Sequence, residues 1–371
     1  MRAVIYKGIG EIAVQDAPVP EIGPKDVLVK NMRAGICGTD ISAYLKGGDD
    51  LGIFPGGLLG HEFVSEIVEV GAEVEDPQII PGLRVFVNAS TSKRGDDGRT
   101  KLEITDSAGG LSQFISVQDA KIGFNLHPLP DNVSFDQAVV IEPFSVANHG
   151  VNLGKPKAGE RALVFGAGAV GLGVLANLMA NGVEEVIVSD IIPGKLEIVK
   201  QMGGIPVNGK DVDPIEFAKE KFGTVANFLG EERPDVDLYF DSAGAPNALP
   251  DYVRGGKAGS RMVVLALTPQ PIEVPQTQFV LSELTMIGST AYNNEDIAQV
   301  VSYLGDEKYD PTPVVTHHFA QEDVVEAFKT AIEKRTRRLR SSSTSTPRPQ
   351  CSTPGTLRLK SASQGAGRST C

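Results

Sequence analysis

The sequence predicts an α/β fold in which a doubly wound parallel sheet is joined to a second, mainly β domain. From Arg161 to Gly288, short apolar runs alternate with helix-length segments, a pattern that places helices on both faces of a parallel sheet. One apolar run, 162–165, leads directly into the turn Gly166-Ala167-Gly168-Ala169-Val170-Gly171. Before residue 150, by contrast, the apolar runs are short and β-like and are separated by Gly and Pro.

The first part of the chain is expected to be built mainly from strands. The expected strands are at 3–6, 27–30, 64–70, 82–87 and 114–117. The polar, charged segment 90–110 is expected to be a loop. Ser134 is a candidate N-cap for a helix at about 135–149, which carries Glu142 among apolar residues.

A polar connector at 155–160, with Pro and Gly, is the best candidate for a domain boundary. The strands expected after it are 162–165, 186–189, 236–240, 262–266 and 284–288, and the helices are 169–181, 194–202, 214–222 and 246–254. After Gly288 the alternation stops. Amphipathic helices are then expected at 296–304 and 323–333, around a short strand at Val314-Val315.

The last 37 residues, 335–371, differ from the rest in composition. They hold eight of the 35 Lys and Arg residues, none of the 47 Asp and Glu residues, and no apolar periodicity. Such a basic stretch, rich in Ser and Thr, is expected to be disordered. It is either a regulatory tail or the product of a reading-frame artefact at about residue 336.

Composition limits the classes of function. A length of 371 residues favours two domains, and a net charge of −12 argues against nucleic acid or an anionic membrane as the main partner. The apolar run within residues 1–7 is too short for a secretory signal. The three cysteines, Cys37, Cys351 and Cys371, do not form a disulfide framework, which favours a cytoplasmic location.

The glycine turn predicts a dinucleotide site of the Rossmann type. Gly166 permits a tight turn, Gly168 lets the backbone approach a pyrophosphate, and Gly171 lets the following helix pack closely. The helix N-terminus then offers free N–H groups to the phosphates. The motif alone is weak because 41 of the 371 residues are Gly, and the uncharged stretch between Arg161 and Glu184 also permits a membrane helix.

Asp190 favours NAD over NADP as the cofactor. It closes the next strand, where a carboxylate accepts the ribose hydroxyls and repels a 2′-phosphate, and Ile191-Ile192 supply no cation. Val170, Ala243 and Leu265 are further candidates for contacts with the dinucleotide. Ala243 follows the end of one predicted strand and Leu265 is at the end of another, and strand ends are also simply turns.

Four residues are of the types that bind zinc: Cys37, His61, Glu62 and Glu142. Thiolate, imidazole and carboxylate all suit this ion. Each also has an ordinary structural role, as a buried small hydrophobe, a surface His-Glu pair, or a helix-capping or ion-paired glutamate. Their spacing alone leaves metal binding open.

Residues 1 to about 333 resemble the zinc-dependent medium-chain dehydrogenases, in their polyol (sorbitol-like) and butanediol branch. The segments that carry the resemblance are Gly35-Ile36-Cys37-Gly38-Thr39-Asp40, Gly60-His61-Glu62-Phe63, Gly82-Leu83-Arg84-Val85 and Glu142-Pro143-Phe144-Ser145-Val146, besides the glycine turn. The resemblance implies a GroES-like catalytic domain at 1–152 and 289–334 around an NAD-binding domain at 153–288. It also implies hydride transfer between NAD and a secondary alcohol, polyol or vicinal diol.

In that family, Cys37, His61 and either Glu62 or Glu142 would bind one catalytic zinc, and the other glutamate would be an exchangeable ligand. Thr39 would pass the hydroxyl proton outward, or else merely support the turn, and Asp40 would support His61. Segment 90–110 has no cysteine, so no structural zinc is expected. The resemblance further implies a homodimer or homotetramer, with the strand near 284–288 pairing across a two-fold axis.

The sequence departs from the family pattern at two places, and two other functions remain open. Ser42 stands where relatives often carry a proton-relay His, and the tail does not resemble the family's last strand. Threonine dehydrogenase is the alternative within enzymes. The alternative outside enzymes is a nucleotide-binding protein without catalysis, of the crystallin-like or redox-sensing kind.

Overall fold

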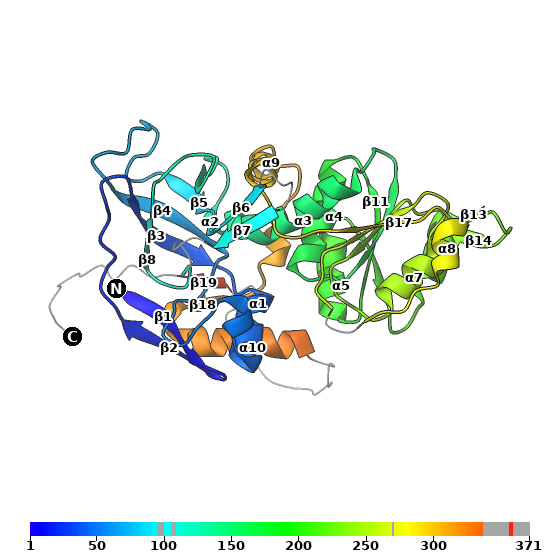
Figure 1. Ribbon diagram of the computed structural model, residues 1–371, viewed down its shortest axis with the longest axis horizontal. Coiled ribbons are helices and arrows are strands. Elements are labelled where there is room, and N and C mark those ends of the chain that lie inside the picture. The colour runs from blue at the N-terminus through cyan, green and yellow to red at the C-terminus, as the bar shows by residue number, and fades with distance from the viewer. Residues whose placement is uncertain (95–99, 105–108, 269–270, 337–355, 359–371) are drawn as a thin grey trace, which may run out of the picture.

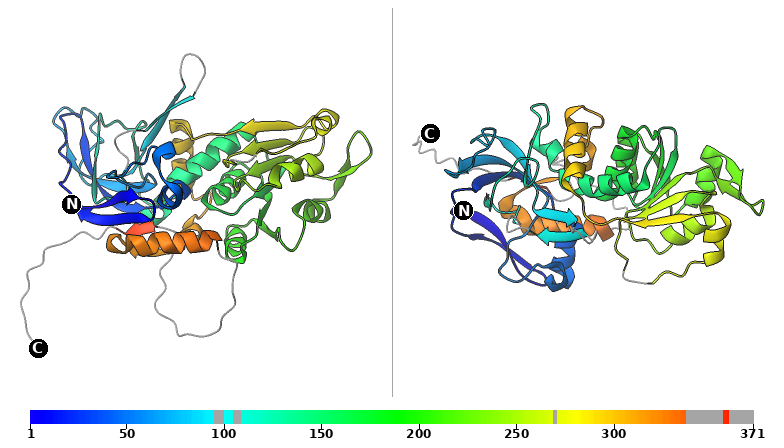
Figure 2. Two further views of the ribbon diagram at one scale, coloured as in Figure 1. Left: turned by 60° about the horizontal axis from the view of Figure 1, so that its bottom comes forward. Right: turned by 45° about the horizontal axis from the view of Figure 1, so that its top comes forward.

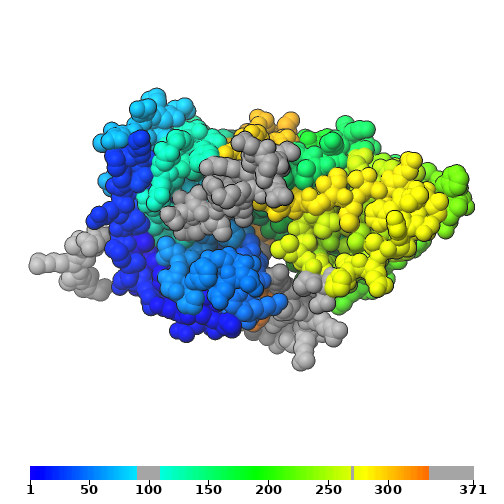
Figure 3. All heavy atoms as spheres, viewed as in Figure 1, coloured from blue at the N-terminus to red at the C-terminus, as the bar shows by residue number. Residues whose placement is uncertain are grey.

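The computed structural model describes residues 1–94, 100–104, 109–268, 271–336 and 356–358, and only the backbone of 90–94, 100–104, 334–336 and 356–358. A mainly β half and an α/β half lie side by side (Figure 1). The space-filling view shows the same division, with blue-to-cyan residues on one side and green-to-yellow residues on the other (Figure 3).

The α/β half is built on a six-stranded parallel sheet. Its strands are β10 (Arg161–Phe165), β11 (Glu185–Asp190), β12 (Ile205–Asn208), β15 (Leu238–Asp241), β16 (Arg261–Val264) and β17 (Thr285–Gly288), in the order β12-β11-β10-β15-β16-β17. All neighbours are parallel. This order is that of a doubly wound Rossmann sheet and confirms the predicted fold class.

The helices of this half are α4 (Ala169–Ala180), α5 (Pro193–Gln201), α6 (Pro214–Phe222), α7 (Ala248–Gly255) and α8 (Gln276–Leu281). A two-stranded hairpin, β13 (Thr224–Ala226) and β14 (Glu232–Pro234), lies between α6 and β15. The predicted strands and helices of this region agree with the structure to within two residues at each end. Strand β12, the hairpin β13–β14 and helix α8 were not predicted. No described helix has both the length and the apolar character needed to cross a bilayer.

Alternate residues of the central strands enter two different hydrophobic cores. On β10, Leu163 packs with Ile187 and Tyr239 in one core, while Val164 packs with Val188 in the other. All of these side chains are fully buried. Since strand side chains alternate between the two faces of a sheet, both faces of this sheet are covered, and each such side chain stabilises the fold by about 1.5–3 kcal/mol.

The β half contains a seven-stranded sheet. The path is β18 (His318–Ala320), β19 (Thr356–Arg358), β3 (Val27–Ala34), β4 (Phe63–Val70), β5 (Arg84–Val87) and β9 (Leu126–Pro128), and β8 (Phe114–Val117) pairs with β3. A separate hairpin joins β1 (Arg2–Gly8) to β2 (Glu11–Asp16). Helix α10 (Val324–Thr336) lies against this hairpin (Figure 2).

The five strands predicted in this half are present, but the loop predicted at 90–110 is partly wrong. Strands β6 (Ser90–Arg94) and β7 (Thr100–Ile104) form an antiparallel pair there. Segments 95–99 and 105–108 lie outside the described residues. The sequence did not reveal the pair, because these polar segments lack the apolar alternation by which a half-buried strand is recognised.

The helix predicted at 135–149 is wrong as a single element. The structure has α2 (Phe135–Ala138), capped by Ser134 as predicted, and then α3 (Ile141–Gly154). Pro143 explains the break. It has no N–H, and its ring would clash with the carbonyl of Val139 in a continuous helix, but it is tolerated in the first turn of α3.

The strand predicted at Val314-Val315 is also wrong. Val314 ends the 3₁₀ turn η2 (Thr312–Val314), and β18 begins only at His318. Both valines are buried in a core without pairing in a ladder, and the fixed φ of Pro313 favours the turn. Helices α9 (Asn294–Gly305) and α10 confirm the two helices predicted on either side.

The predicted disorder of the tail is wrong for three residues. Strand β19 lies between β18, to which it is parallel, and β3, to which it is antiparallel, with Leu357 opposite Ala34. Its backbone pairs with the edges of both strands. The amino-acid composition of the tail gives no sign of this pairing. Residues 337–355 and 359–371 lie outside the described part of the chain.

Candidate metal and dinucleotide sites

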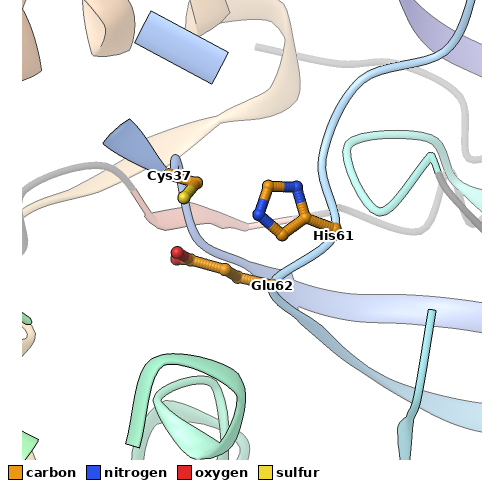
Figure 4. A group of neighbouring side chains, drawn as sticks. All are labelled: Cys37, His61 and Glu62. Atoms are coloured by element: carbon orange, nitrogen blue, oxygen red, sulfur yellow. The ribbon is translucent and has the colours of Figure 1, made fainter. Parts of the chain in front are cut away.

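Cys37, His61 and Glu62 converge in the β half (Figure 4). One ligand atom from each lies within 4.8 Å of the others. The register of the sheet explains this convergence, because Ala34 at the end of β3 pairs with Phe63 at the start of β4. The residues just after β3 and just before β4 are therefore neighbours.

Two glycines shape this triad. Gly60 has φ +93°, a left-handed conformation that favours glycine, and it supplies the turn through which His61 and Glu62 reach the same point. At Gly35 an added Cβ would lie 2.3 Å from Glu62 Oε2. The backbone N–H of Gly35 also donates to the carbonyl of Glu62 at 2.6 Å, so the two segments are in direct contact.

Asp40 supports the triad from α1 (Gly38–Lys46), which begins just after Cys37. Its Oδ2 accepts a hydrogen bond from the backbone N–H of Cys37 at 2.9 Å, and its Oδ1 lies 3.9 Å from His61 Nδ1. The carboxylate is buried. It is therefore placed to orient both the cysteine and the histidine, as outer-shell carboxylates do in metal sites.

The electrostatics of the triad fit a cation. Burial, with a contribution from the charge of Glu62, raises the pKa of the Cys37 thiol to about 11. Burial and then the charge of Glu142 raise the pKa of Glu62. Burial disfavours the imidazolium of His61, but Asp40, Cys37 and Glu142 together outweigh the burial and raise the pKa of His61 well above its usual value. A divalent cation would displace these protons and supply the positive charge that the triad needs.

Glu142 lies beside the triad, not in it. It is the second residue of α3, is 8% exposed, and interacts electrostatically with Glu62 and His61. In the described part of the chain, Cys37, His61 and Glu62 form the only three-residue group with metal-ligand geometry. Of the two glutamates between which the sequence left the choice open, Glu62 is the one that meets Cys37 and His61. Thr39 is the second residue of α1, and its relay role stays a prediction.

The glycine turn has the geometry that a pyrophosphate site needs. Gly166 has φ +102°, and an added Cβ at Gly171 would lie 2.0 Å from the carbonyl oxygen of Gly166, so only glycine fits there. Gly168 caps α4 without a side-chain hydrogen bond, and nothing lies within 4 Å of a Cβ built on it. A pyrophosphate would therefore meet no Cβ at Gly168, beside the N-terminus of α4.

The turn stands where the strand order of the sheet reverses. Chain order runs outward from β10 through β11 to β12 on one side and from β15 to β17 on the other. Ligands of doubly wound sheets bind at this point, outside the carboxyl ends of the strands. Ala243 follows β15 and lies next to the turn, since a Cβ on Gly166 would meet its Cβ at 2.9 Å.

Val170 and Leu265 have less direct positions. Val170 is the second residue of α4 and packs partly into the core. Leu265 follows β16 and packs against α3, because a Cβ on Gly150 would lie 2.7 Å from Leu265 Cδ2. Whether either side chain touches the cofactor stays a prediction.

Asp190 lies at the end of β11, as predicted, and reaches back to the turn. Its Oδ2 accepts a hydrogen bond from the backbone N–H of Ala167 at 2.9 Å. Lys195 Nζ lies 3.3 Å from the same oxygen. The sequence did not point to this lysine, because the two residues directly after Asp190 are Ile191 and Ile192 and Lys195 is five residues away. A position in the first turn of the next helix was the signal that could have found it.

Comparisons with known proteins match both halves of the chain. A family model described as "Alcohol dehydrogenase GroES-like domain" matches residues 23–131, and one described as "Zinc-binding dehydrogenase" matches 169–305. Sorbitol dehydrogenase of Mus musculus is 30% identical over 344 residues, covering 89% of this chain and 92% of the relative. (R,R)-butanediol dehydrogenase of Bacillus subtilis is 27% identical over 342 residues, covering 88% and 94%.

A solved structure of 2R,3R-butanediol dehydrogenase from Bacillus subtilis has a TM-score of 0.78 and 25% identity, and the alignment covers 96% of this chain and 99% of that one. The resemblance therefore extends over both halves of the molecule. With the metal triad at the β3–β4 junction and the glycine turn of the parallel sheet, it shows that the chain belongs to the zinc-dependent medium-chain dehydrogenase family.

Proposed function

We propose that this protein transfers a hydride between NAD(H) and a secondary alcohol, polyol or vicinal diol and the corresponding ketone. The observation that carries the proposal is the convergence of Cys37, His61 and Glu62 within 4.8 Å. The relatives named above, a sorbitol dehydrogenase and a butanediol dehydrogenase, support a substrate with neighbouring hydroxyl groups.

The residues of the β half would hold the cation and handle the proton. Cys37, His61 and Glu62 bind zinc, and Asp40 orients His61 from behind. Zinc, when bound, supplies a Lewis acid that makes the hydroxyl proton of an alcohol easier to remove. Thr39 accepts that proton and passes it outward. The carboxylate of Glu142 lies beside the triad as a second acidic group.

The residues of the α/β half would hold NAD. Gly166, Gly168 and Gly171 leave room for the pyrophosphate, and the N-terminus of α4 binds its charge. Asp190 accepts the ribose hydroxyls, with Lys195 beside it. Ala243 follows the strand next to β10 and would contact the nicotinamide half.

The test is a substrate panel with the purified chain. Sorbitol, 2,3-butanediol and threonine are each supplied with NAD, and the appearance of NADH is followed at 340 nm, with and without a chelator. We expect reduction of NAD with the polyol or the diol, and loss of activity on chelation. The proposal fails if activity survives the removal of metal, or if Cys37→Ala is as active as the native chain.

Two alternatives are less well supported. The relatives named above are sorbitol and butanediol dehydrogenases, which does not favour threonine dehydrogenase. A nucleotide-binding protein without catalysis would not need the assembled ligand set. Binding of NAD by a chain that holds no zinc would favour this non-enzymatic alternative.

The assembly and the domain limits are also proposals. Strand β17 is the last in its sheet, and Met286 on it is 50% exposed, so a second copy could continue the sheet in a homodimer, and two dimers in a homotetramer. We place the catalytic domain at 1–152 and 289–334 and the cofactor domain at 153–288. The absence of a disulfide framework supports a cytoplasmic location.

A further inference from the structure

Asn31 is a buried asparagine that no part of the proposed mechanism uses. It lies on β3 and is fully buried. Its Nδ2 donates to two backbone carbonyls, that of Gly110 at 3.2 Å and that of Ser112 at 2.9 Å. Its Oδ1 accepts a hydrogen bond from the hydroxyl of Ser65 on β4 at 2.7 Å. Both donors of the amide therefore bind one short segment, and the serine fixes the direction in which the amide faces.

That segment, the turn at 109–112 just before β8, is stabilised by side chains. Besides the two carbonyls that Asn31 binds, the carbonyl between them, that of Leu111, accepts a hydrogen bond from Gln321 Nε2 at 2.7 Å. Gln321 begins the 3₁₀ turn η3 (Gln321–Asp323) and is 2% exposed. Because a buried carbonyl without a donor costs free energy, the two amides favour one conformation of the 109–112 turn.

The same turn contacts Gly60, the residue just before the histidine of the metal triad. The N–H groups of Gly109 and Gly110 both donate to the carbonyl of Gly60 at 2.9 Å. A Cβ on Gly60 would lie 2.8 Å from Leu111 Cγ and 2.9 Å from its backbone nitrogen. Gly110 thus joins the two contacts, because its carbonyl accepts from Asn31 and its N–H donates to Gly60.

Asn31 also lies at a β-bulge between the two strands that lead to the triad. It is opposite Ser65 in the ladder, but Arg33, two residues later, is opposite Val64, only one residue earlier on β4. Met32 is therefore the extra residue, and such a bulge changes the direction of the strand after it. The hydrogen bond between the Asn31 and Ser65 side chains stabilises the pair directly before this shift.

We propose that Asn31 is a positioning residue of the metal site. By fixing the 109–112 turn it sets the position of Gly60, and with it the direction in which His61 reaches the other two members of the triad. Without the amide, the turn shifts, Gly60 follows it, and His61 loses its alignment. This inference rests on the proposed zinc-dependent function.

The experiment compares the full-length chain with Asn31→Leu, which has a similar volume but cannot donate. Zinc affinity is measured in competition with a chromophoric chelator. Each protein is also loaded with Co²⁺, whose visible absorption depends on the geometry and kind of its ligands. We expect zinc affinity to fall by roughly 10- to 100-fold, the range of outer-shell substitutions, and the Co²⁺ spectrum to change. Binding of NADH, followed by its fluorescence, should be unchanged, because the cofactor half is not altered.

Asn125→Leu is the matched control. Asn125 is also a buried asparagine of the β half, 5% exposed, and its Nδ2 donates to the backbone carbonyls of Gln118 at 2.8 Å and Asp119 at 3.4 Å. These partners are not the residues that donate to Gly60. Both substitutions should lower the Tm of the metal-free chain, but only Asn31→Leu should lower the zinc affinity and change the Co²⁺ spectrum.

Gln321→Leu is a second route to the same turn if Asn31→Leu does not fold. It removes the donor to the carbonyl of Leu111 without altering β3. We expect this variant to lower the zinc affinity by roughly 10-fold or more, again without an effect on the binding of NADH.

The outcomes are distinct. Native zinc affinity and a native Co²⁺ spectrum in Asn31→Leu, or in Gln321→Leu where Asn31→Leu does not fold, would overturn the inference while the native chain still binds metal and reduces NAD. Equal losses of zinc affinity in Asn31→Leu and Asn125→Leu would reduce the effect to packing and overturn the inference as well. A native chain that binds no metal overturns the proposed function, and this inference with it.

Discussion

Gly35→Ala tests the metal site without replacing any proposed ligand. The added Cβ would lie 2.3 Å from Glu62 Oε2, whereas ordinary contacts begin at 3.4 Å, so the carboxylate must move by about 1.1 Å. Displacements of about 1 Å in a preorganised site cost roughly 100-fold. We therefore expect zinc affinity to fall by roughly 10- to 100-fold, equivalent to about 1.4–2.7 kcal/mol.

The assay is zinc binding in competition with a chromophoric chelator, together with chemical denaturation of the metal-free chain. The nearest atom in the way belongs to the flexible end of the Glu62 side chain, and Glu62 Cβ, at 3.1 Å, needs to shift by only a few tenths of an ångström. The metal-free stability should therefore fall by only about 1 kcal/mol. Gly194→Ala is the control, because nothing lies within 4 Å of a Cβ at that helical position. It should bind zinc normally. If Gly35→Ala binds zinc as tightly as the native chain, the placement of Glu62 in the ligand set is wrong.

Three further results are expected. Asp190→Ala should raise the KM for NAD about 10-fold or more in steady-state kinetics. It should also lower the preference for NAD over NADP, because Lys195 is then free to meet a 2′-phosphate. An unchanged preference would count against this site. Since the folded-state pKa of Cys37 rises from 9.0 to about 11, the metal-free chain should lose stability between about pH 9 and pH 11 in denaturant titrations, and Cys37→Ala should remove that loss. Truncation after Thr336 removes β19, so β3 and β18 lose a pairing partner. The Tm should fall by about 2 °C or more in calorimetry. An equal Tm would show that β19 does not contribute to the stability of the fold.

Prediction from the sequence succeeded where one periodicity dominates. In the parallel sheet, strands buried on both faces appear as continuous apolar runs. Helices of nine or more residues separate most of these strands. The ends of the strands and helices could therefore be predicted to within two residues. It failed for β9 (Leu126–Pro128) and β19 (Thr356–Arg358), which have three residues each. So short a segment has no period of its own, and only its neighbours in the sheet make it a strand.

The candidate site was predictable in its residue types but not in its arrangement. Cys37, His61 and Glu62 were named from their chemistry, yet their meeting depends on the pairing of Ala34 with Phe63, a register that spacing along the chain does not contain. Lys195 was missed for the same reason. It approaches Asp190 only after the next helix has folded back, and it belongs to no motif.

Helix α3 explains how the two sites keep a fixed relation. It carries Glu142 at one end, beside the metal triad, and at the other end a Cβ on Gly154 would lie 3.3 Å from Phe240 and Val263 of the cofactor sheet. Its 14 residues span about 21 Å, and Asn177 on α4 donates to the carbonyl of Phe144 at 3.0 Å. Hydride transfer requires the reacting atoms to be close and aligned. A single buried helix, packed on the glycine-turn helix and on α9, fixes this alignment better than the loops that join the two halves, because its backbone hydrogen bonds resist bending along the whole distance.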